Sequence, residues 1–309
     1  MEDVGKNLKK IMNRGNYQAR YEEMMTQVLA DPDVQAFLEE NADKLTEEDI
    51  VRSYSKLYEF VKEKQKFRVQ DATMLAPGYE PQLTLNYHYV DVAYVPTDEL
   101  LKRREQEEIR QRIQTYDIPK DVRHAMMKTV HRTPERTQII LEILQFVKEY
   151  ATSPQEFHKG LYLAGDVGRG KTYLLGAMAN ELAQRGFQTM LVHYPTFSYN
   201  VKRSIADNSV NEKIEPVKKA PILVLDDVGA DAITSWTRDE VFGVILQYRM
   251  QEELPTFFTS NMTMESLEKF LTLTRDGDEP LKAKRIMERI RYLSKEAVLQ
   301  GPNLRNPQE

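Results

Sequence analysis

The chain lacks cysteine altogether, which excludes disulfide bonds and thiolate metal sites from its 309 residues. It also lacks any run that approaches the roughly 20 apolar residues of a membrane span. The N-terminal residues 1–13 have no apolar core of the kind found in signal peptides. We therefore expect a cytoplasmic protein that has no membrane partner.

Histidine is sparse, and positive charge is not in excess. Five histidines stand far apart, with no HExxH or H-x-H pair that would suggest a metal site: His88, His124, His131, His158 and His193. The net charge of −5 provides no global attraction for nucleic acid, so any such binding must come from a local patch. The length suggests about two domains and is sufficient for a sizeable core.

Residues 165–172 read GDVGRGKT and fit the phosphate-binding loop G-x-x-x-x-G-K-[ST]. The glycines let successive backbone N–H groups approach a polyphosphate. An apolar run at 161–165 predicts the preceding strand, and helical spacing up to Gly186 predicts the following helix, which disfavours a chance glycine turn. We expect ATP to bind Gly165, Asp166, Val167, Gly168, Arg169, Gly170, Lys171, Thr172 and Tyr173. Thr172 would hold Mg²⁺ through its hydroxyl.

Two later strands are predicted to end in polar side chains. Residues 221–229, PILVLDDVG, form an apolar run that ends in two carboxylates, the Walker B pattern. Asp226 would bind Mg²⁺ through water, and Asp227 would orient or deprotonate the attacking water. Residues 255–261 predict another strand, which would place Asn261 beside Asp226 near the γ-phosphate.

The first third of the chain is predicted to be mainly helical. An apolar stripe marks a first helix, at Tyr17, Tyr21, Met24, Met25, Val28 and Leu29. A second helix follows Pro32, and a third is predicted over Ile50–Phe67 after a cap at Thr46. Helix packing is the simplest use of the stripe, although part of it could face another protein.

Alternation over residues 83–95 predicts two or three short strands, and the charged residues 98–116 predict a solvated connecting helix. We accordingly predict an N-terminal domain over 1–100, a linker helix over 101–120 and a nucleotide-binding domain over 121–309. A buried helix should precede the phosphate-binding loop, with Val130–Pro134 as a candidate pocket for the base.

The phosphate-binding loop, the Asp-Asp strand, the TSN strand and KRIMERIRYL near the end, in this order, resemble the AAA+ ATPases of the bacterial helicase-loader group. The motifs span about 165–305. The resemblance implies an α/β fold: an AAA+ P-loop ATPase domain with a central parallel sheet, preceded by a smaller, mainly helical (α+β) domain. Because some relatives bind zinc through cysteines in the first domain, this cysteine-free chain must stabilise that domain by packing.

The same resemblance assigns roles to individual residues. Lys171 and Thr172 correspond to the Walker A pair, Asn261 to sensor 1, and Asp227 to the second Walker B acid. Arg289 resembles the arginine finger of the group and Arg305 its sensor 2 arginine. Most AAA+ proteins have Glu where this chain has Asp227, and the shorter side chain implies slow or partner-stimulated hydrolysis.

The function implied by the resemblance is ATP-dependent loading of the hexameric replicative helicase onto single-stranded DNA during primosome assembly. Other primosome proteins and self-association through AAA+ interfaces are further expected contacts. For DNA we expect Phe197, Tyr199, Lys202 and Arg203, which combine aromatic and basic side chains, although an amphipathic surface helix explains them equally well. Alternatives are a transposition helper ATPase and an ATP-switched adaptor without significant turnover; a nucleotide kinase fits the late arginines less well.

Overall fold

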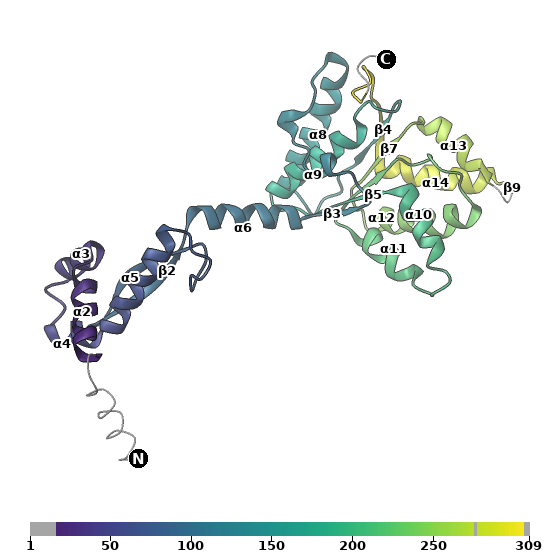
Figure 1. Ribbon diagram of the computed structural model, residues 1–309. Coiled ribbons are helices and arrows are strands. Elements are labelled where there is room, and N and C mark those ends of the chain that lie inside the picture. Colours follow the sequence, from purple (N-terminus) through teal and green to yellow (C-terminus); the bar gives the residue numbers. More distant parts are fainter. Residues whose placement is uncertain (1–16, 275–276, 306–309) are drawn as a thin grey trace. The chain divides into compact units, whose positions relative to one another are not determined.

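The computed structural model describes residues 17–274 and 277–305. The chain divides between Glu105 and Gln106 into two compact units, each of which is described by itself (Figure 1). No helix among the described residues is both long and apolar enough to cross a membrane.

The first unit combines a group of helices with a β-hairpin. Its elements are α2 (Tyr17–Leu29), α3 (Pro32–Glu40), α4 (Glu47–Arg52), α5 (Tyr54–Arg68), β1 (Tyr79–Asn86) and β2 (Tyr89–Pro96). The two strands pair antiparallel along their full length. A small core joins helices and hairpin, and its buried side chains are Met25, Val28, Val34, Leu57, Phe60, Val61 and Val90. The mainly helical α+β character predicted for this region is confirmed.

The predicted stripe on the first helix is only partly core. Met25 and Val28 are buried, whereas Tyr21 is 49% exposed. The side chain of Tyr17 lies outside the described residues. Met24 and Leu29 are partly buried and pack against the same core. The stripe therefore stabilises the unit through four of its members and leaves the aromatic side chain of Tyr21 on the surface.

The predicted single helix over Ile50–Phe67 is wrong, because the chain forms two helices that meet at Ser53. The Ser53 hydroxyl donates a hydrogen bond to the Asp49 carbonyl at 2.7 Å and accepts one from the Val90 N–H at 2.9 Å. This buried hydroxyl ties the break to the hairpin, a tertiary contact that helical periodicity cannot reveal. The predicted cap is present: Thr46 and Asp49 form a capping box at the start of α4.

Helix α6 (Asp98–Gln111) contains the division between the units and buries none of its side chains. It is followed directly by β3 (Ile113–Tyr116), which pairs in parallel with β5 (Thr189–His193). The linker helix predicted over 101–120 thus ends at Gln111, and the rest of that range belongs to the second unit. Short strands at a sheet edge carry little periodic signal, which is why the pattern missed β3.

The second unit is built on a six-stranded parallel sheet whose order is β10-β4-β7-β6-β5-β3. Its other strands are β4 (Gly160–Ala164), β6 (Ile222–Asp226), β7 (Thr256–Ser260) and β10 (Ser294–Val298). The helices are α7 (Lys120–Arg123), η1 (Met127–Thr129), α8 (Pro134–Thr152), α9 (Lys171–Gln184), α10 (Tyr194–Arg203), α11 (Val210–Lys219), η2 (Thr237–Phe242), α12 (Gly243–Gln251), α13 (Met264–Thr272) and α14 (Pro280–Leu293). A two-residue ribbon joins β8 (Leu273–Thr274) to β9 (Gly277–Asp278).

Helices cover both faces of this sheet (Figure 1). Alternate strand residues belong to two separate cores. On β4, Leu161 and Leu163 pack with α8 and α9, whereas Tyr162 and Ala164 pack on the face covered by α10 to α14. Because both faces are buried, the strands read as continuous apolar runs. The carboxyl ends of β4, β5, β6 and β7 consequently lie along one edge, where loops can gather polar side chains.

Candidate active site

The glycine loop leaves the end of β4 and leads into α9, which begins at Lys171. Gly168 and Gly170 have φ angles of 79° and 80°, a conformation that favours glycine. A Cβ on Gly168 would lie 2.1 Å from Oδ1 of Asn303, so a side chain there would also displace the C-terminal segment. The strand, loop and helix predicted for a phosphate-binding loop are all present.

Lys171 is buried, with 7% of its surface exposed, and its ammonium group is hydrogen-bonded to oxygen atoms. The Nζ atom donates to the carbonyls of Gly165 at 2.6 Å and Asp166 at 2.9 Å, and to Oδ1 of Asn261 at 2.8 Å. Burial lowers the pKa of Lys171, while the carboxylate of Asp227 opposes this effect. The three oxygen acceptors match the three donors of an ammonium group, which is thereby held beside the loop.

Asp226 ends β6 and accepts two hydroxyl hydrogen bonds. Oγ1 of Thr172 donates to Oδ1 of Asp226 at 2.6 Å, and Oγ1 of Thr259 donates to the same oxygen at 2.7 Å. The helix after the glycine loop and two adjacent strands are thereby joined at one carboxylate. A hydroxyl and a carboxylate are the hard oxygen ligands that suit Mg²⁺, which usually also takes phosphate oxygens. No group of three or more His, Cys, Asp or Glu side chains suited to a metal ion occurs over 17–274 and 277–305.

Asp227 adopts a left-handed backbone conformation with φ 59°, which is uncommon for a residue other than glycine. Its N–H donates to Oγ1 of Thr259 at 2.9 Å, and Nδ2 of Asn261 donates to its carboxylate at 3.3 Å. Burial and the adjacent Asp226 carboxylate raise the pKa of Asp227. Asn261, the residue after β7, thus holds the side chain of Asp227 at the carboxyl end of the sheet. The sequence predicts Asn261 beside Asp226, and the structure shows its hydrogen bond to the neighbouring Asp227.

A row of polar side chains in contact with one another, which the sequence did not predict, extends from Asp227. Nε2 of His193 lies 4.0 Å from the Asp227 carboxylate, and its Nδ1 lies 2.8 Å from the Thr196 hydroxyl. That hydroxyl donates to Asp117 at 2.6 Å. His193 is the last residue of β5, so its position at the end of a parallel strand was the signal that could have identified it.

These side chains face a cleft of about 860 Å³. From the loop region, its lining includes Val167, Gly168, Gly170, Lys171, Thr172 and Tyr173, together with Asp226, Asp227 and Asn261. Gly165, Asp166 and Arg169 do not line the cleft; Arg169 forms an ion pair with Asp166 at 2.6 Å, and the carbonyls of Gly165 and Asp166 hold Lys171. This volume is in the range of ordinary ligand pockets.

The region predicted as the base pocket, Val130–Pro134, contributes only His131 to the cleft, and Val130 is buried in the core. Residues 118–123, which precede this region in the chain, also line the cleft. Residues 118–123 reach the cleft because α7 packs against α9, a contact that the sequence did not predict. The place of the base itself stays a prediction.

The two late arginines lie in different places. Arg305 lines the cleft, because the chain after β10 returns over the glycine loop and the Leu304 N–H donates to the Gly168 carbonyl at 2.9 Å. Arg289 is absent from the cleft lining, and its Nη1 donates to the Gly243 carbonyl at 2.8 Å. On the same helix, Arg291 is paired with Glu268 at 2.6 Å.

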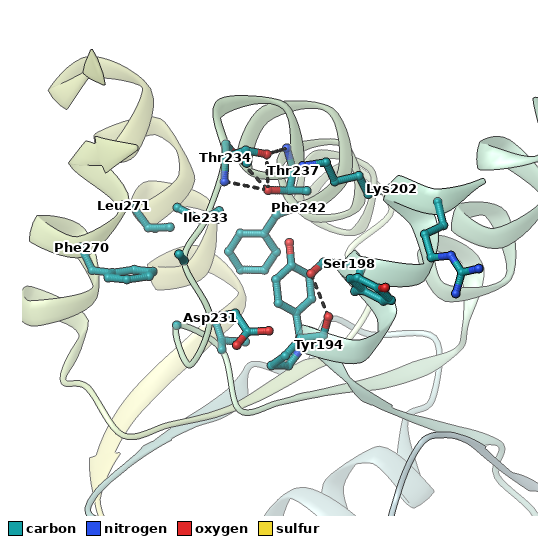
Figure 2. A pocket seen from close by; sticks show the side chains of 16 residues that line it. Tyr194, Ser198, Lys202, Asp231, Ile233, Thr234, Thr237, Phe242, Phe270 and Leu271 are labelled. Atoms are coloured by element: carbon teal, nitrogen blue, oxygen red, sulfur yellow. Dashed lines mark hydrogen bonds between the residues drawn. The ribbon is translucent and has the colours of Figure 1, made fainter. Parts of the chain in front are cut away.

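The predicted DNA-contacting segment is helix α10. Phe197 is 1% exposed and packs edge-on against Tyr116, so it is a core residue and not a stacking surface for bases. Tyr199 is 60% exposed, and the guanidinium of Arg203 lies 5.9 Å from its ring centre. With Lys202, these two residues border a second pocket of about 460 Å³ (Figure 2).

The glycine loop, the paired carboxylates and the asparagine on the intervening strand together define a P-loop ATPase domain of the AAA+ class. The model of the IstB-like ATP binding proteins matches residues 92–308, and that of the primosomal protein DnaI N-terminus matches residues 1–94. The replicative helicase loader DnaI of Bacillus subtilis (strain 168) is 37% identical over 313 residues, covering 99% of this chain and all of the relative. The chain belongs to the DnaI family of replicative helicase loaders, with an IstB-like ATPase domain.

Solved structures agree with this assignment. A crystal structure of DnaI is 46% identical with a TM-score of 0.57, and the match covers 62% of this chain and 98% of the solved one. The DnaC helicase loader, at 23% identity and a TM-score of 0.50, covers 59% of this chain and all of the solved one, and it shares the fold.

Proposed function

We propose that this chain uses ATP to load a ring-shaped replicative helicase onto single-stranded DNA during primosome assembly. The observation that carries the proposal is similarity to a helicase loader along the whole chain, combined with an ATPase site whose residues are assembled in one cleft. The N-terminal unit binds the helicase, and the second unit binds and hydrolyses ATP.

Within the cleft, Lys171 contacts the phosphates with its ammonium group, and Thr172 and Asp226 hold Mg²⁺. When bound, Mg²⁺ neutralises charge on the phosphate oxygens. Asp227 accepts a proton from the attacking water or orients it, and Asn261 holds that water in line. The support for this division of labour is that Asn261 is hydrogen-bonded to both Lys171 and Asp227.

The arginines act from two subunits. Arg305 serves the phosphates in its own subunit, because it lies in the same cleft as Lys171. Arg289 completes the site of a neighbouring copy, since it lies on α14 outside its own cleft. A guanidinium is suited to this role because its planar fork can bond two phosphate oxygens.

Single-stranded DNA binds the face of α10 that carries Tyr199, Lys202 and Arg203. Figure 2 shows Tyr194 and Phe242 side by side in the pocket below this face, with Asp231 to one side and Lys202 to the other. Aromatic and basic groups of this kind bind single strands without reading sequence. Tyr194 follows His193, and Val228 of the same pocket follows Asp227. Residues 193–194 and residues 227–228 therefore each line both the ATP cleft and this pocket. We expect DNA bound at the pocket to stimulate ATP hydrolysis through these two segments.

The alternatives are less well supported. A transposition helper would share the ATPase domain, but the match over residues 1–94 is to a DnaI N-terminal domain. An adaptor that uses ATP only as a switch would show no turnover. Steady-state phosphate release, measured with and without single-stranded DNA, separates that adaptor from a loader: we expect slow release that DNA or helicase accelerates.

A further inference from the structure

Three arginines are buried among the described residues: Arg136, Arg238 and Arg249. A buried guanidinium is costly unless its charge and its donors are satisfied. The three arginines differ in the hydrogen-bond acceptors and the charged partners that surround each guanidinium.

Two of them are satisfied within the protein. Arg238 donates to Asp239 at 2.7 Å and to Glu279 at 2.6 Å, which pairs its charge directly. Arg249 donates to four oxygens, and three of the bonds are 2.8 Å or shorter: those to Ala220, Pro255 and Thr256; the fourth, to Lys218, is 3.1 Å. Both arginines therefore stabilise the fold that surrounds them.

Arg136 is different, because its guanidinium has no hydrogen bond or ion pair with any described residue. Only 2% of the residue is exposed, and Nε is buried without a partner. Burial lowers the pKa of Arg136, and no acidic side chain counters that effect. It is also the third residue of α8, where the positive end of the helix makes a cation still less favourable.

The location of Arg136 identifies the missing partner. Its side chain lines the nucleotide cleft together with Lys171 and Thr172. A Cβ placed on Gly170 would lie 3.2 Å from Nη2 of Arg136, so the guanidinium is packed against the last glycine of the phosphate-binding loop. A polyphosphate in this loop would supply Arg136 with oxygen acceptors and with negative charge. Among the buried arginines of the described residues, Arg136 is the one that has neither within the protein.

We propose that Arg136, in the first turn of α8, is a phosphate-binding residue of the ATP site, an inference that rests on the ATP-dependent function proposed above. In the nucleotide-free protein its charge destabilises the fold, and binding of the phosphates removes that penalty. The residue therefore contributes to affinity twice, through its bonds to phosphate and through relief of an unfavourable buried charge.

The test is displacement of a fluorescent ATP analogue from the full-length protein by MgATP and by inorganic tripolyphosphate. Arg136→Gln should weaken both competitors by a similar factor, about 10- to 100-fold, as expected for a lost charge-assisted bond. Arg136→Lys keeps the positive charge without the planar pair of guanidinium donors, and it should recover part of the lost affinity. Arg185→Gln, which removes an exposed guanidinium at the end of α9, is the matched control and should have no effect.

A second measurement excludes a merely structural role. Without nucleotide, the melting temperature of Arg136→Gln should equal or exceed that of the wild type, and its rise on adding MgATP should be smaller. Unchanged affinity for both competitors would overturn the proposal. So would a loss confined to MgATP with tripolyphosphate unaffected, since Arg136 would then contact the nucleoside.

Discussion

The ammonium of Lys171 and the side-chain oxygen of Asn261 are hydrogen-bonded at 2.8 Å, although the two residues are 90 positions apart. The glycine loop of β4 and the end of β7 are thus connected directly. Asn261 also donates to Asp227, so one amide links the phosphate-binding cation to the proposed general base. A bound phosphate would compete for Lys171 and thereby free Asn261 to hold water.

Lys171→Ala should weaken ATP binding by at least about tenfold, because a charge-assisted bond to phosphate is removed. The fold should remain intact, since removing the side chain opens space from the cleft toward the carbonyls of Gly165 and Asp166, which water can fill. Binding of a fluorescent ATP analogue and circular dichroism check the two parts. Lys269→Ala removes an exposed lysine of α13 and is the control. Wild-type affinity in Lys171→Ala would refute the loop assignment.

Asp227→Asn should retain ATP binding and lose turnover, because the amide cannot accept a proton. It should also change stability. The pKa of Asp227 is raised in the folded protein. Ionisation of this carboxyl therefore destabilises the fold increasingly as pH rises from the unfolded pKa to the folded pKa, and fully above the folded pKa. The variant should consequently be more stable than the wild type at neutral pH, and the difference should vanish at pH values below the unfolded pKa of about 3.9. Urea unfolding at several pH values measures this difference in the free energy of unfolding. A difference that grows as the pH is lowered would contradict the prediction.

Arg289→Ala should bind ATP normally and lose hydrolysis, by about 10³ to 10⁵ in rate if the guanidinium stabilises the transition state. Mixing it with Lys171→Ala should restore part of the activity, because the Lys171→Ala subunit supplies an intact arginine to a competent site. Phosphate release from the mixture is the measurement. Mutants that assemble normally but remain inactive together would show that Arg289 does not act between subunits.

Two aromatic residues of α10 should behave oppositely. Tyr199→Ala should weaken single-stranded DNA binding by about 1–3 kcal/mol, the usual value for one stacked base, and leave stability unchanged. Phe197→Ala should instead destabilise the second unit by about 3–5 kcal/mol, because it opens a cavity in the core. Fluorescence anisotropy with a labelled oligonucleotide and thermal unfolding separate the two effects. DNA affinity that is insensitive to Tyr199 would remove α10 from the proposed interface.

The parts of the site that the sequence could predict are those fixed by local pattern. The loop glycines, Lys171 and Thr172 form one contiguous motif, and Asp226, Asp227 and Asn261 each follow an apolar run. Parallel pairing then brings the strand ends together, as Leu225 opposite Phe258 demonstrates.

The remaining features depend on contacts between distant segments. The burial of Phe197 follows from packing against Tyr116, and the unpartnered state of Arg136 depends on what surrounds it in three dimensions. Spacing on α10 could not distinguish a core aromatic from an exposed one, since both faces of an amphipathic helix can carry aromatic side chains. His193 had no second ligand or motif nearby, so only the sheet revealed its place beside Asp227.

The N-terminal unit should bind helicase without the ATPase domain. A fragment ending at Glu105 retains the core of Met25, Leu57 and Val90, and we expect it to fold and to retain helicase in a pull-down. Replacing the exposed Tyr21 by Ser should weaken the interaction by about tenfold, as for an aromatic anchor at an interface. The matched control is Val69→Ser, which alters another exposed apolar side chain of this unit. Retention of helicase only by residues 106–309 would place the helicase-binding site in the second unit.

The most direct test of the central claim is the amount of hexameric replicative helicase that remains on closed circular single-stranded DNA after a high-salt wash. A closed circle retains only helicase that encircles it. We expect the wild-type chain with ATP to increase retention strongly, and Lys171→Ala to fail under the same conditions. Equal retention with the wild type, with Lys171→Ala and with no added chain would contradict ATP-dependent loading.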